Sequence, residues 1–214
     1  MDLLTAFIDI ILHLDAHLLA LTQQYGVWVY AILFLIIYCE TGLVIMPFLP
    51  GDSLLFVAGA LCGMGALQLE LLVPFLVLAA FSGDNTNYWI GRKVGKRLVK
   101  MGDSRFLKHE HLDKTHAFYK KHGGKTIVFA RFLPIVRTFA PFVAGIGKMD
   151  YRLFMLFSAL GNLFWIVFFV VGGYFLGNIP VIKNNLTLMV LVIVFISVTP
   201  ALIEFIRQRR AQNS

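Results

Sequence analysis

The stretch RFLPIVRTFAPFVAG, residues 131–145, decides how this chain folds. It is mostly apolar, yet it carries two arginines, Arg131 and Arg137, and two prolines, Pro134 and Pro141. A proline removes a backbone donor and clashes with the preceding helical turn, so one uninterrupted helix through these residues is disfavoured. The stretch is too broken for an ordinary membrane helix and too apolar for a loop.

A second copy of this pattern lies earlier in the chain, in PFLPGDSLLFVAG at residues 47–59. FLP recurs at 48–50 and 132–134, and FVAG recurs at 56–59 and 142–145. Two motifs in the same order, each in a broken apolar segment, indicate an internal duplication. Turns are expected at the prolines and at one glycine. The turn-forming residues are Pro50, Gly51, Pro134 and Pro141.

Each copy is predicted to be a re-entrant segment, one over about 47–66 and the other over about 126–148. Backbone groups released by a proline or a turn cannot face lipid, so they must face protein or a wet cavity. A segment that enters the membrane, turns at FLP and leaves on the same side meets this requirement.

The composition of the whole chain is that of an integral membrane protein. Of its 214 residues, 58% are hydrophobic and 14% are charged, against about 25% charged in soluble domains. The mean hydropathy is +0.77. A spanning helix needs about 20 apolar residues. Four segments are predicted to span: about 27–46, about 70–90 (less cleanly, with Pro74 and Asp84), about 153–176 and about 186–206.

The first residues contain no Lys or Arg, so they lack the charged beginning of a signal peptide. Polar residues recur there every three or four positions, which predicts an amphipathic helix over residues 1–24 lying at the membrane surface. A spanning helix is the alternative. The polar stripe consists of Asp2, Thr5, Asp9, His13 and His17.

Basic residues are confined to the second part of the chain. Residues 1–91 hold no Lys or Arg, and 11 of the 19 lie in residues 92–125. The positive-inside rule therefore places 92–125 and the basic C-terminus in the cytoplasm. Counting spans from there makes the two re-entrant segments enter from opposite faces, which is the inverted repeat that many transporters use to build a site near the midplane.

The predicted fold is all-α, with one membrane domain over residues 1–214. Its parts are the interfacial helix (1–24), the first repeat (25–91), a basic cytoplasmic connector (92–125), the second repeat (126–178), and an outer loop, last spanning helix and cytoplasmic tail (179–214). A basic segment can also bind nucleic acid, but between membrane spans it favours anionic lipid, and no nucleic acid is expected.

Four charged residues lie in or beside the two copies: Glu40, Asp52, Arg131 and Arg137. A charge at the membrane centre costs at least about 2.5–3.5 kcal/mol, so these groups should pair or line water. The planar arginine fork suits phosphate, and carboxylates in such a cavity can take up protons. The interpretation is a phosphate-headgroup site coupled to protonation, with Asp84 as a further candidate. An ion-pair cluster that only fixes the fold is the alternative.

Other chemistry is less well supported. His109, Asp113 and His116 would share one helical face, yet a solvated helix explains them better than a metal site, and neither metal nor cofactor is predicted. Cys39 and Cys62 are expected to be packing residues.

Several long motifs resemble the DedA family of bacterial inner-membrane proteins, close to its namesake branch. They are ETGLVIMPFLPGDSLLFVAG at 40–59, GDNTNYWIG at 83–91, KTHAFYKKHGGKT at 114–126 and the stretch at 131–145. The resemblance implies a VTT (SNARE-associated) domain with two re-entrant helices. It also implies a multi-pass transporter of undecaprenyl phosphate or other phospholipids, driven by the proton-motive force with protons as the coupling ion.

Carried over by motif, the resemblance makes Glu40 and Asp52 the proton-coupling pair and Arg131 and Arg137 the headgroup-binding pair. The expected partners are the membrane and an anionic lipid or polyprenyl phosphate, with a homo-oligomer left open. A proton/cation antiporter and a structural envelope-maintenance protein are the alternatives. An enzyme is not expected, because the motifs of aspartyl intramembrane proteases and a histidine beside the arginines are both missing from the sequence.

The charge asymmetry predicts that residues 92–125 face the cytoplasm and residues 177–185 face outward. In a chain with Cys39 and Cys62 replaced by serine, Glu110→Cys should resist an impermeant thiol reagent on intact cells, whereas Asn184→Cys should react. Labelling at position 110 from outside would overturn this topology.

Overall fold

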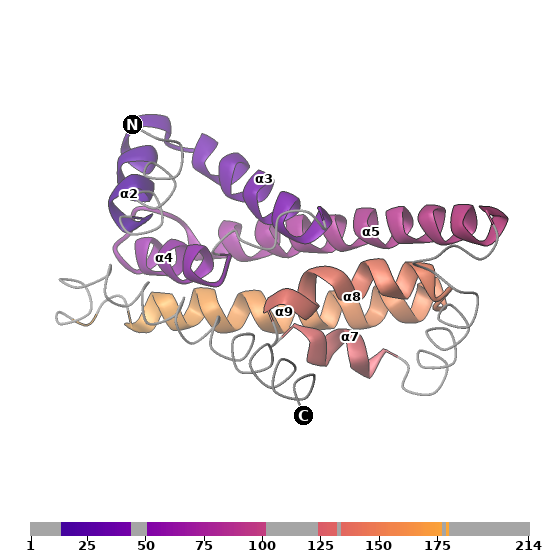
Figure 1. Cartoon of the computed structure of the whole chain (residues 1–214). Helices are drawn as coiled ribbons and strands as arrows, with labels where there is room; N and C mark the ends of the chain where they lie inside the picture. Colours follow the sequence, from indigo (N-terminus) through magenta and orange to yellow (C-terminus); the bar gives the residue numbers. More distant parts are fainter. Residues whose placement is uncertain (1–13, 44–50, 102–123, 132–133, 177–178, 180–214) are drawn as a thin grey trace, which may run out of the picture. The chain divides into compact units, whose positions relative to one another are not determined.

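The computed structural model describes residues 14–43, 51–101, 124–131, 134–176 and 179, and every regular element within them is an α-helix (Figure 1). This agrees with the predicted all-α class. The helices are α2 (Leu14–Tyr25), α3 (Trp28–Gly42), α4 (Gly51–Gly63), α5 (Leu69–Met101), α7 (Lys125–Ala130), α8 (Pro134–Ile146) and α9 (Tyr151–Leu176).

The described helices belong to two compact units. The first unit contains α2 and α4. It also contains α3 up to Ile36, α5 up to Leu76 and α9 from Trp165 onward. The second unit contains α7, α8 and the remaining portions of those three helices. Each unit therefore holds one copy of the FVAG motif, on α4 in the first and on α8 in the second.

Two helices in the described residues are long and apolar enough to cross a membrane, Leu69–Gly95 within α5 and Tyr151–Leu176, which is α9. They correspond to the predicted spans at 70–90 and 153–176. The helix α9 starts where Asp150 Oδ1 accepts hydrogen bonds from the backbone N–H groups of Arg152 and Leu153, both at 3.0 Å. Such a cap satisfies donors that the first turn leaves open.

The other two predicted spans have less support. The helix α3 has 15 residues, fewer than the roughly 20 that a span needs, and the predicted segment at 186–206 lies outside the described residues. The four-span count stays a prediction. The helix α5 has 33 residues and continues through the basic residues to Met101, so the beginning of the predicted connector is helical. Residues 102–123 lie outside the described part.

The predicted N-terminal helix is described only in its second half. The helix α2 begins at Leu14 and ends at Tyr25, and it packs against α4. Residues 1–13, with most of the predicted polar stripe, lie outside the described residues. The interfacial position of this helix therefore stays a prediction.

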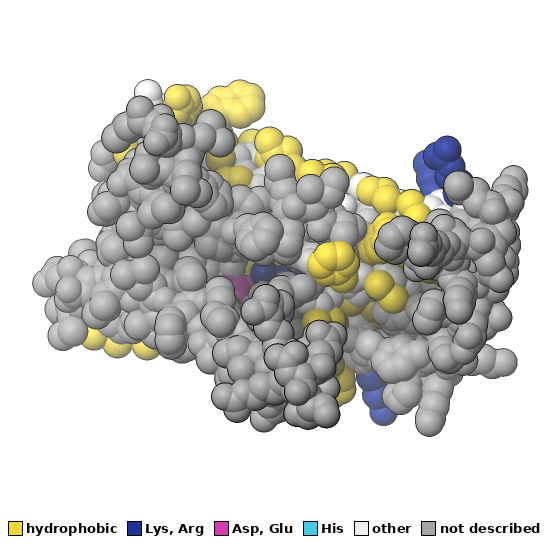
Figure 2. Space-filling view, viewed as in Figure 1, with side chains coloured by type: hydrophobic (Ala, Val, Ile, Leu, Met, Phe, Trp, Pro, Cys, Tyr) yellow, Lys and Arg dark blue, Asp and Glu magenta, His cyan; other side chains and the backbone are white. Residues whose placement is uncertain are grey.

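Polar and apolar side chains are distributed in the way expected for a protein in lipid. Seven charged or amide side chains in the described residues are buried, while large apolar side chains on α9 such as Leu156, Phe164 and Phe168 are more than half exposed. Figure 2 likewise shows mostly hydrophobic side chains on the described part of the visible face. In the hydrocarbon region apolar groups can face outward, whereas charges face the protein interior.

The FVAG motif of the first copy makes a close helix crossing. A Cβ added to Gly59 of α4 would lie 2.0 Å from the carbonyl oxygen of Val170 on α9. In return, a Cβ added to Gly173 of α9 would lie 2.0 Å from the carbonyl oxygen of Phe56 on α4. Only glycine allows two helix backbones to approach this closely.

The second copy makes the same crossing with α5. A Cβ on Gly145 of α8 would lie 2.1 Å from the carbonyl oxygen of Tyr88, and a Cβ on Gly91 would lie 2.1 Å from that of Phe142. The spacing is the same in both units. Phe56 and Gly59 face Val170 and Gly173 in the first unit, and Phe142 and Gly145 face Tyr88 and Gly91 in the second. The two residues of each pair are three positions apart. The duplication seen in the sequence therefore also appears in the packing. The helix after the first copy, α5, packs against the second copy, and the helix after the second copy, α9, packs against the first.

The second copy differs from the turn prediction at one of its two prolines, Pro141. In the second copy α7 ends at Ala130 with Arg131 as its C-cap, and α8 begins at Pro134, while residues 132–133 lie outside the described residues. Proline suits that first position because its missing N–H is not needed there. Pro141 does not mark a turn: it lies inside α8, where the helix continues despite the one hydrogen bond that proline cannot donate.

In the first copy the turn itself is not described. Gly51 is the first residue of α4, and Pro50 lies outside the described residues. In the second copy α7 and α8 pack against each other. The way in which either copy enters the membrane stays a prediction.

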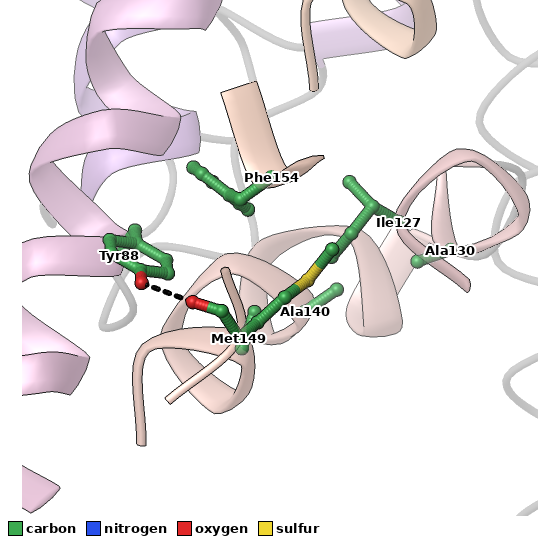
Figure 3. Packing of buried hydrophobic residues seen from close by; sticks show 7 residues of the cluster. Tyr88, Ile127, Ala130, Ala140, Met149 and Phe154 are labelled. Carbon is green, nitrogen blue, oxygen red and sulfur yellow. Dashed lines mark hydrogen bonds between the residues drawn. The ribbon is translucent and has the colours of Figure 1, made fainter. Parts of the chain in front are cut away.

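A buried apolar cluster holds the second unit together (Figure 3). The Tyr88 ring of α5 stacks on Phe154 of α9 with ring centroids 4.5 Å apart. Its hydroxyl donates to the carbonyl oxygen of Met149 at 2.7 Å. Ile127 and Ala140 bring α7 and α8 to the same cluster. This packing joins α5, α7, α8 and α9, and three of these helices carry or end at the buried charges Asp84, Arg131 and Arg137.

The reciprocal glycine contacts predict that neighbouring glycines of α9 respond differently to alanine. Gly173→Ala should lower the free energy of unfolding by about 1–3 kcal/mol, because its Cβ meets a backbone carbonyl that cannot rotate away. Gly172→Ala, whose Cβ meets nothing within 4 Å, should change it by no more than about 1 kcal/mol. Unfolding of the purified variants in detergent measures both values. Equal effects of the two substitutions would contradict the crossing.

Candidate binding site

The first ion pair of the second unit joins α3 to α8. Arg137 lies in the first turn of α8, and its Nη2 donates to Glu40 Oε1 at 2.6 Å. Their side chains are 5% and 1% exposed. Glu40 lies two residues before the end of α3. This contact spans 97 residues of sequence and unites an acid and an arginine that the sequence places beside different copies of the repeat.

The second ion pair is centred on Asp84, in the middle of α5. Arg131 Nη2 donates to Asp84 Oδ2, and both side chains are almost completely buried. The same oxygen also accepts hydrogen bonds from Ser158 Oγ at 2.5 Å and from Asn162 Nδ2 at 2.9 Å. Three donors from α7 and α9 thus converge on one carboxylate oxygen.

Uncharged contacts bring these helices close enough for both pairs to form. Asn87 Nδ2 donates to the carbonyl oxygens of Thr41 at 3.0 Å and Thr138 at 2.7 Å, which links α5 to α3 and α8. Gly83 has no room for a side chain, because an added Cβ would lie 2.9 Å from the carbonyl oxygen of Tyr38 on α3. The small residues around Asp84 therefore let the end of α3 approach α5.

The two arginines flank the break between α7 and α8. Arg131 is the C-cap of α7, and Arg137 is the fourth residue of α8. Arg131 interacts electrostatically with both Arg137 and Glu40, so the two ion pairs form one charged cluster. Six residues along a continuous helix would turn the two side chains roughly 120° apart. The break allows them to lie in one cluster.

Some buried polar atoms of this cluster have no hydrogen-bond partner among the described residues. They include Arg131 Nη1, Asp84 Oδ1 and the side-chain oxygens of Asn87 and Asn162. A buried polar atom without a partner costs about 1–3 kcal/mol. Native proteins satisfy nearly all such atoms, so these atoms are candidates for contact with water or a ligand.

Asp52 lies in the first unit, near the beginning of α4. Its Oδ1 accepts a hydrogen bond from Trp165 Nε1 of α9 at 2.8 Å. A carboxylate in the first turn of a helix also interacts favourably with the helix dipole. The prediction that Asp52 joins Glu40 and the arginines in one site stays a prediction.

The structure thus gathers three of the four main predicted residues, Glu40, Arg131 and Arg137, and adds Asp84 as a central member. Sequence reasoning missed Ser158, Asn162, Asn87 and Trp165. A signal for two of them existed, because Ser158 and Asn162 are four residues apart in an otherwise apolar span, and polar residues in such spans face the protein interior. Within the described residues, no group of three or more His, Cys, Asp or Glu could hold a metal ion.

Comparisons with known proteins agree with the fold and the motifs. The VTT domain family model matches residues 49–175. Protein DedA of Escherichia coli strain K12 is 54% identical over 213 residues, which cover 99% of this chain and 97% of that protein. An uncharacterized membrane protein of Mycobacterium tuberculosis is 43% identical over 84% of this chain and 80% of its own length. Inner membrane protein YqjA of E. coli K12 is 34% identical over 85% and 82%. No solved structure matches.

Proposed function

The chain belongs to the DedA family of VTT-domain membrane proteins, and on this premise we propose that it moves a phosphate-bearing lipid across the bacterial inner membrane. Undecaprenyl phosphate is the first candidate, and other phospholipids follow. The observation that carries the proposal is the pair of buried arginines on both sides of the α7–α8 break, each held by a carboxylate.

Two buried ion pairs contribute less to folding stability than apolar residues in the same places would. Replacing a buried ion pair with apolar residues of similar volume is often neutral or stabilising by about 1–4 kcal/mol. Two such pairs in one small unit therefore favour a function that needs the charges. The same fact argues against the alternative of a purely structural ion-pair cluster.

The choice of arginine points to phosphate as the ligand. The guanidinium is planar, stays charged and can donate two parallel hydrogen bonds to phosphate oxygens. A proton/cation antiporter needs the acids but has no use for two arginines at one break. In our proposal a headgroup takes the place of Glu40 at Arg137 and binds Arg131 beside Asp84, while the lipid tail remains in the bilayer.

Glu40 and Asp52 are the proposed proton-coupling residues. Glu40 neutralises Arg137 when it is ionised, and its protonation would release Arg137 to an anionic headgroup. Asp52 accepts from Trp165 and would exchange this partner on protonation. Protons driven by the membrane potential and pH gradient would then alternate with lipid at the charged groups.

Purified protein in liposomes tests the proposed function and the need for arginine. The wild type should move a prenyl phosphate between leaflets without changing it chemically. Arg137→Lys keeps the charge but loses the planar fork, so headgroup binding and transport should fall about 10- to 100-fold, the equivalent of one charge-assisted hydrogen bond. Arg131→Lys should behave similarly or somewhat more mildly.

The control is Arg152→Lys, which changes an exposed arginine at the beginning of α9 and should leave transport unchanged. Matched amounts of folded protein in the liposomes are required for each comparison. Full transport by both Arg131→Lys and Arg137→Lys would mean that positive charge alone suffices.

The acids are tested by the response of transport to a pH gradient. Glu40→Gln and Asp52→Asn should each remove the acceleration of lipid movement that an imposed gradient gives, because neither amide can take up a proton. Some loss of stability is expected for Glu40→Gln, since Arg137 loses its charged partner. Unchanged gradient dependence in both variants would assign these acids a structural role.

A further inference from the structure

The two members of the Asp84–Arg131 pair each leave one polar atom without a partner. All three described donors to Asp84 converge on Oδ2, while Oδ1 is buried and accepts nothing from the described residues. Arg131 donates through Nη2, while its Nη1 is buried and donates to nothing among them. The same ion pair therefore offers one acceptor and one donor that no described part of the chain uses.

These two atoms define the chemistry of a ligand that would satisfy both. Arg131 Nη1 requires an acceptor oxygen, and ionised Asp84 Oδ1 requires a donor, since a carboxylate only accepts. A phosphate monoester supplies both groups when it carries one proton, a form that predominates below its second pKa of about 6. A phosphate diester has no P–OH group, so it can satisfy only the arginine.

We propose that Asp84 is a specificity-determining residue that accepts a hydrogen bond from the P–OH of a singly protonated phosphate monoester whose P–O⁻ is bound by Arg131. The inference rests on the proposed function and goes further, because it assigns headgroup discrimination to an acid outside the proton-coupling pair. A diester at this position would leave a buried carboxylate oxygen unpaired beside an anionic oxygen. Leaving such a buried polar group without a partner is the strongest means of rejecting a near-identical ligand.

Ser158 and Asn162 support this role by holding Asp84 in place. Both donate to Oδ2, the oxygen that also contacts Arg131, and Asn162 additionally donates to Ser158 Oγ at 3.3 Å. Three donors on Oδ2 hold the carboxylate in one rotamer and keep Oδ1 as the atom that meets the ligand. They position Asp84 but make no contact of their own with the proposed P–OH.

The sharing of one oxygen also distinguishes Asp84 from an acid that only neutralises its arginine. Such an acid would gain most from a two-oxygen contact with the guanidinium fork. Here Arg131, Ser158 and Asn162 all donate to Oδ2. This arrangement suits a carboxylate that holds its arginine with one oxygen and meets a ligand with the other.

The test compares two ligands with the same tail, a long-chain prenyl phosphate and its monomethyl ester, which lacks the P–OH. Binding to the full-length purified protein is measured in detergent at about pH 5.5, where the monoester carries one proton. The wild type should prefer the monoester by about tenfold or more, as expected for one charge-assisted hydrogen bond.

Asp84→Asn is nearly isosteric, keeps an acceptor oxygen for Arg131 and its neighbours, and places an NH₂ donor where Oδ1 was. It should lose the preference for the monoester while still binding the methyl ester. Arg152→Lys is the control, because it changes an exposed residue at the beginning of α9 that does not contact Asp84, and it should keep both affinities and the preference. Inorganic phosphate, added as a competitor, distinguishes a lipid headgroup from free phosphate as the ligand. If it displaces the prenyl phosphate from the wild type but not from Asp84→Asn, the site binds free phosphate by the same chemistry.

The outcomes separate the inference from the function on which it rests. A wild type that binds both lipids equally, or an Asp84→Asn variant that weakens both by the same factor, would overturn the role of Asp84 and leave the proposed lipid transport standing. A wild type that binds and moves neither lipid would overturn both. If Asp84→Asn does not fold, the wild-type comparison of the two ligands decides alone.

Discussion

Two arginine–carboxylate contacts away from water constrain the second unit more than any other feature. A buried arginine must have a carboxylate nearby, because leaving either charge alone costs about 3–5 kcal/mol. Glu40 and Asp84 come from α3 and α5, whereas Arg137 and Arg131 come from the two sides of the α7–α8 break. The break, the small residues around Asp84 and the Asn87 bridge all serve to bring these four groups together. The apolar cluster around Tyr88 then holds α5, α7, α8 and α9 together.

The glycine crossings explain how one duplicated motif can build both units. In each, the FVAG helix lies against a helix that follows the other copy, so Gly59 meets α9 and Gly145 meets α5. Helix association in lipid has no hydrophobic driving force and depends on close packing, which glycine permits. Because the crossings are supplied by backbone and glycine, the other positions of the two copies can diverge. Asp52 and Thr138, which precede the two motifs by the same four residues, show that divergence: one accepts from an indole through its carboxylate and the other from an amide through its backbone.

The sequence by itself determined the class and the outline of this protein. Apolar length predicted the spans in α5 and α9, and the recurrence of FLP and FVAG predicted the duplication, because both are local properties of the chain. The cost of charge in lipid selected Glu40, Asp52, Arg131 and Arg137 from their positions in or beside the two copies. Proline was a less dependable guide, since Pro134 begins a helix and Pro141 lies within one. A helix tolerates the loss of one hydrogen bond when neighbouring helices pack around it.

Only the tertiary structure decided which charge meets which. Glu40 and Arg137 are 97 residues apart, and Asp84 and Arg131 are 47 apart. No periodicity connects such positions, because their distance depends on how the helices cross. The crossings depend in turn on backbone contacts at Gly91 and Gly145, whose partners a sequence does not reveal. For the same reason Asp84 changed from a marginal candidate to the centre of the site, and the indole of Trp165 became a partner of Asp52. The sequence indicates which residues are candidates, because the cost of charge in lipid depends on the residue type, whereas the crossing of the helices determines which of them are in contact.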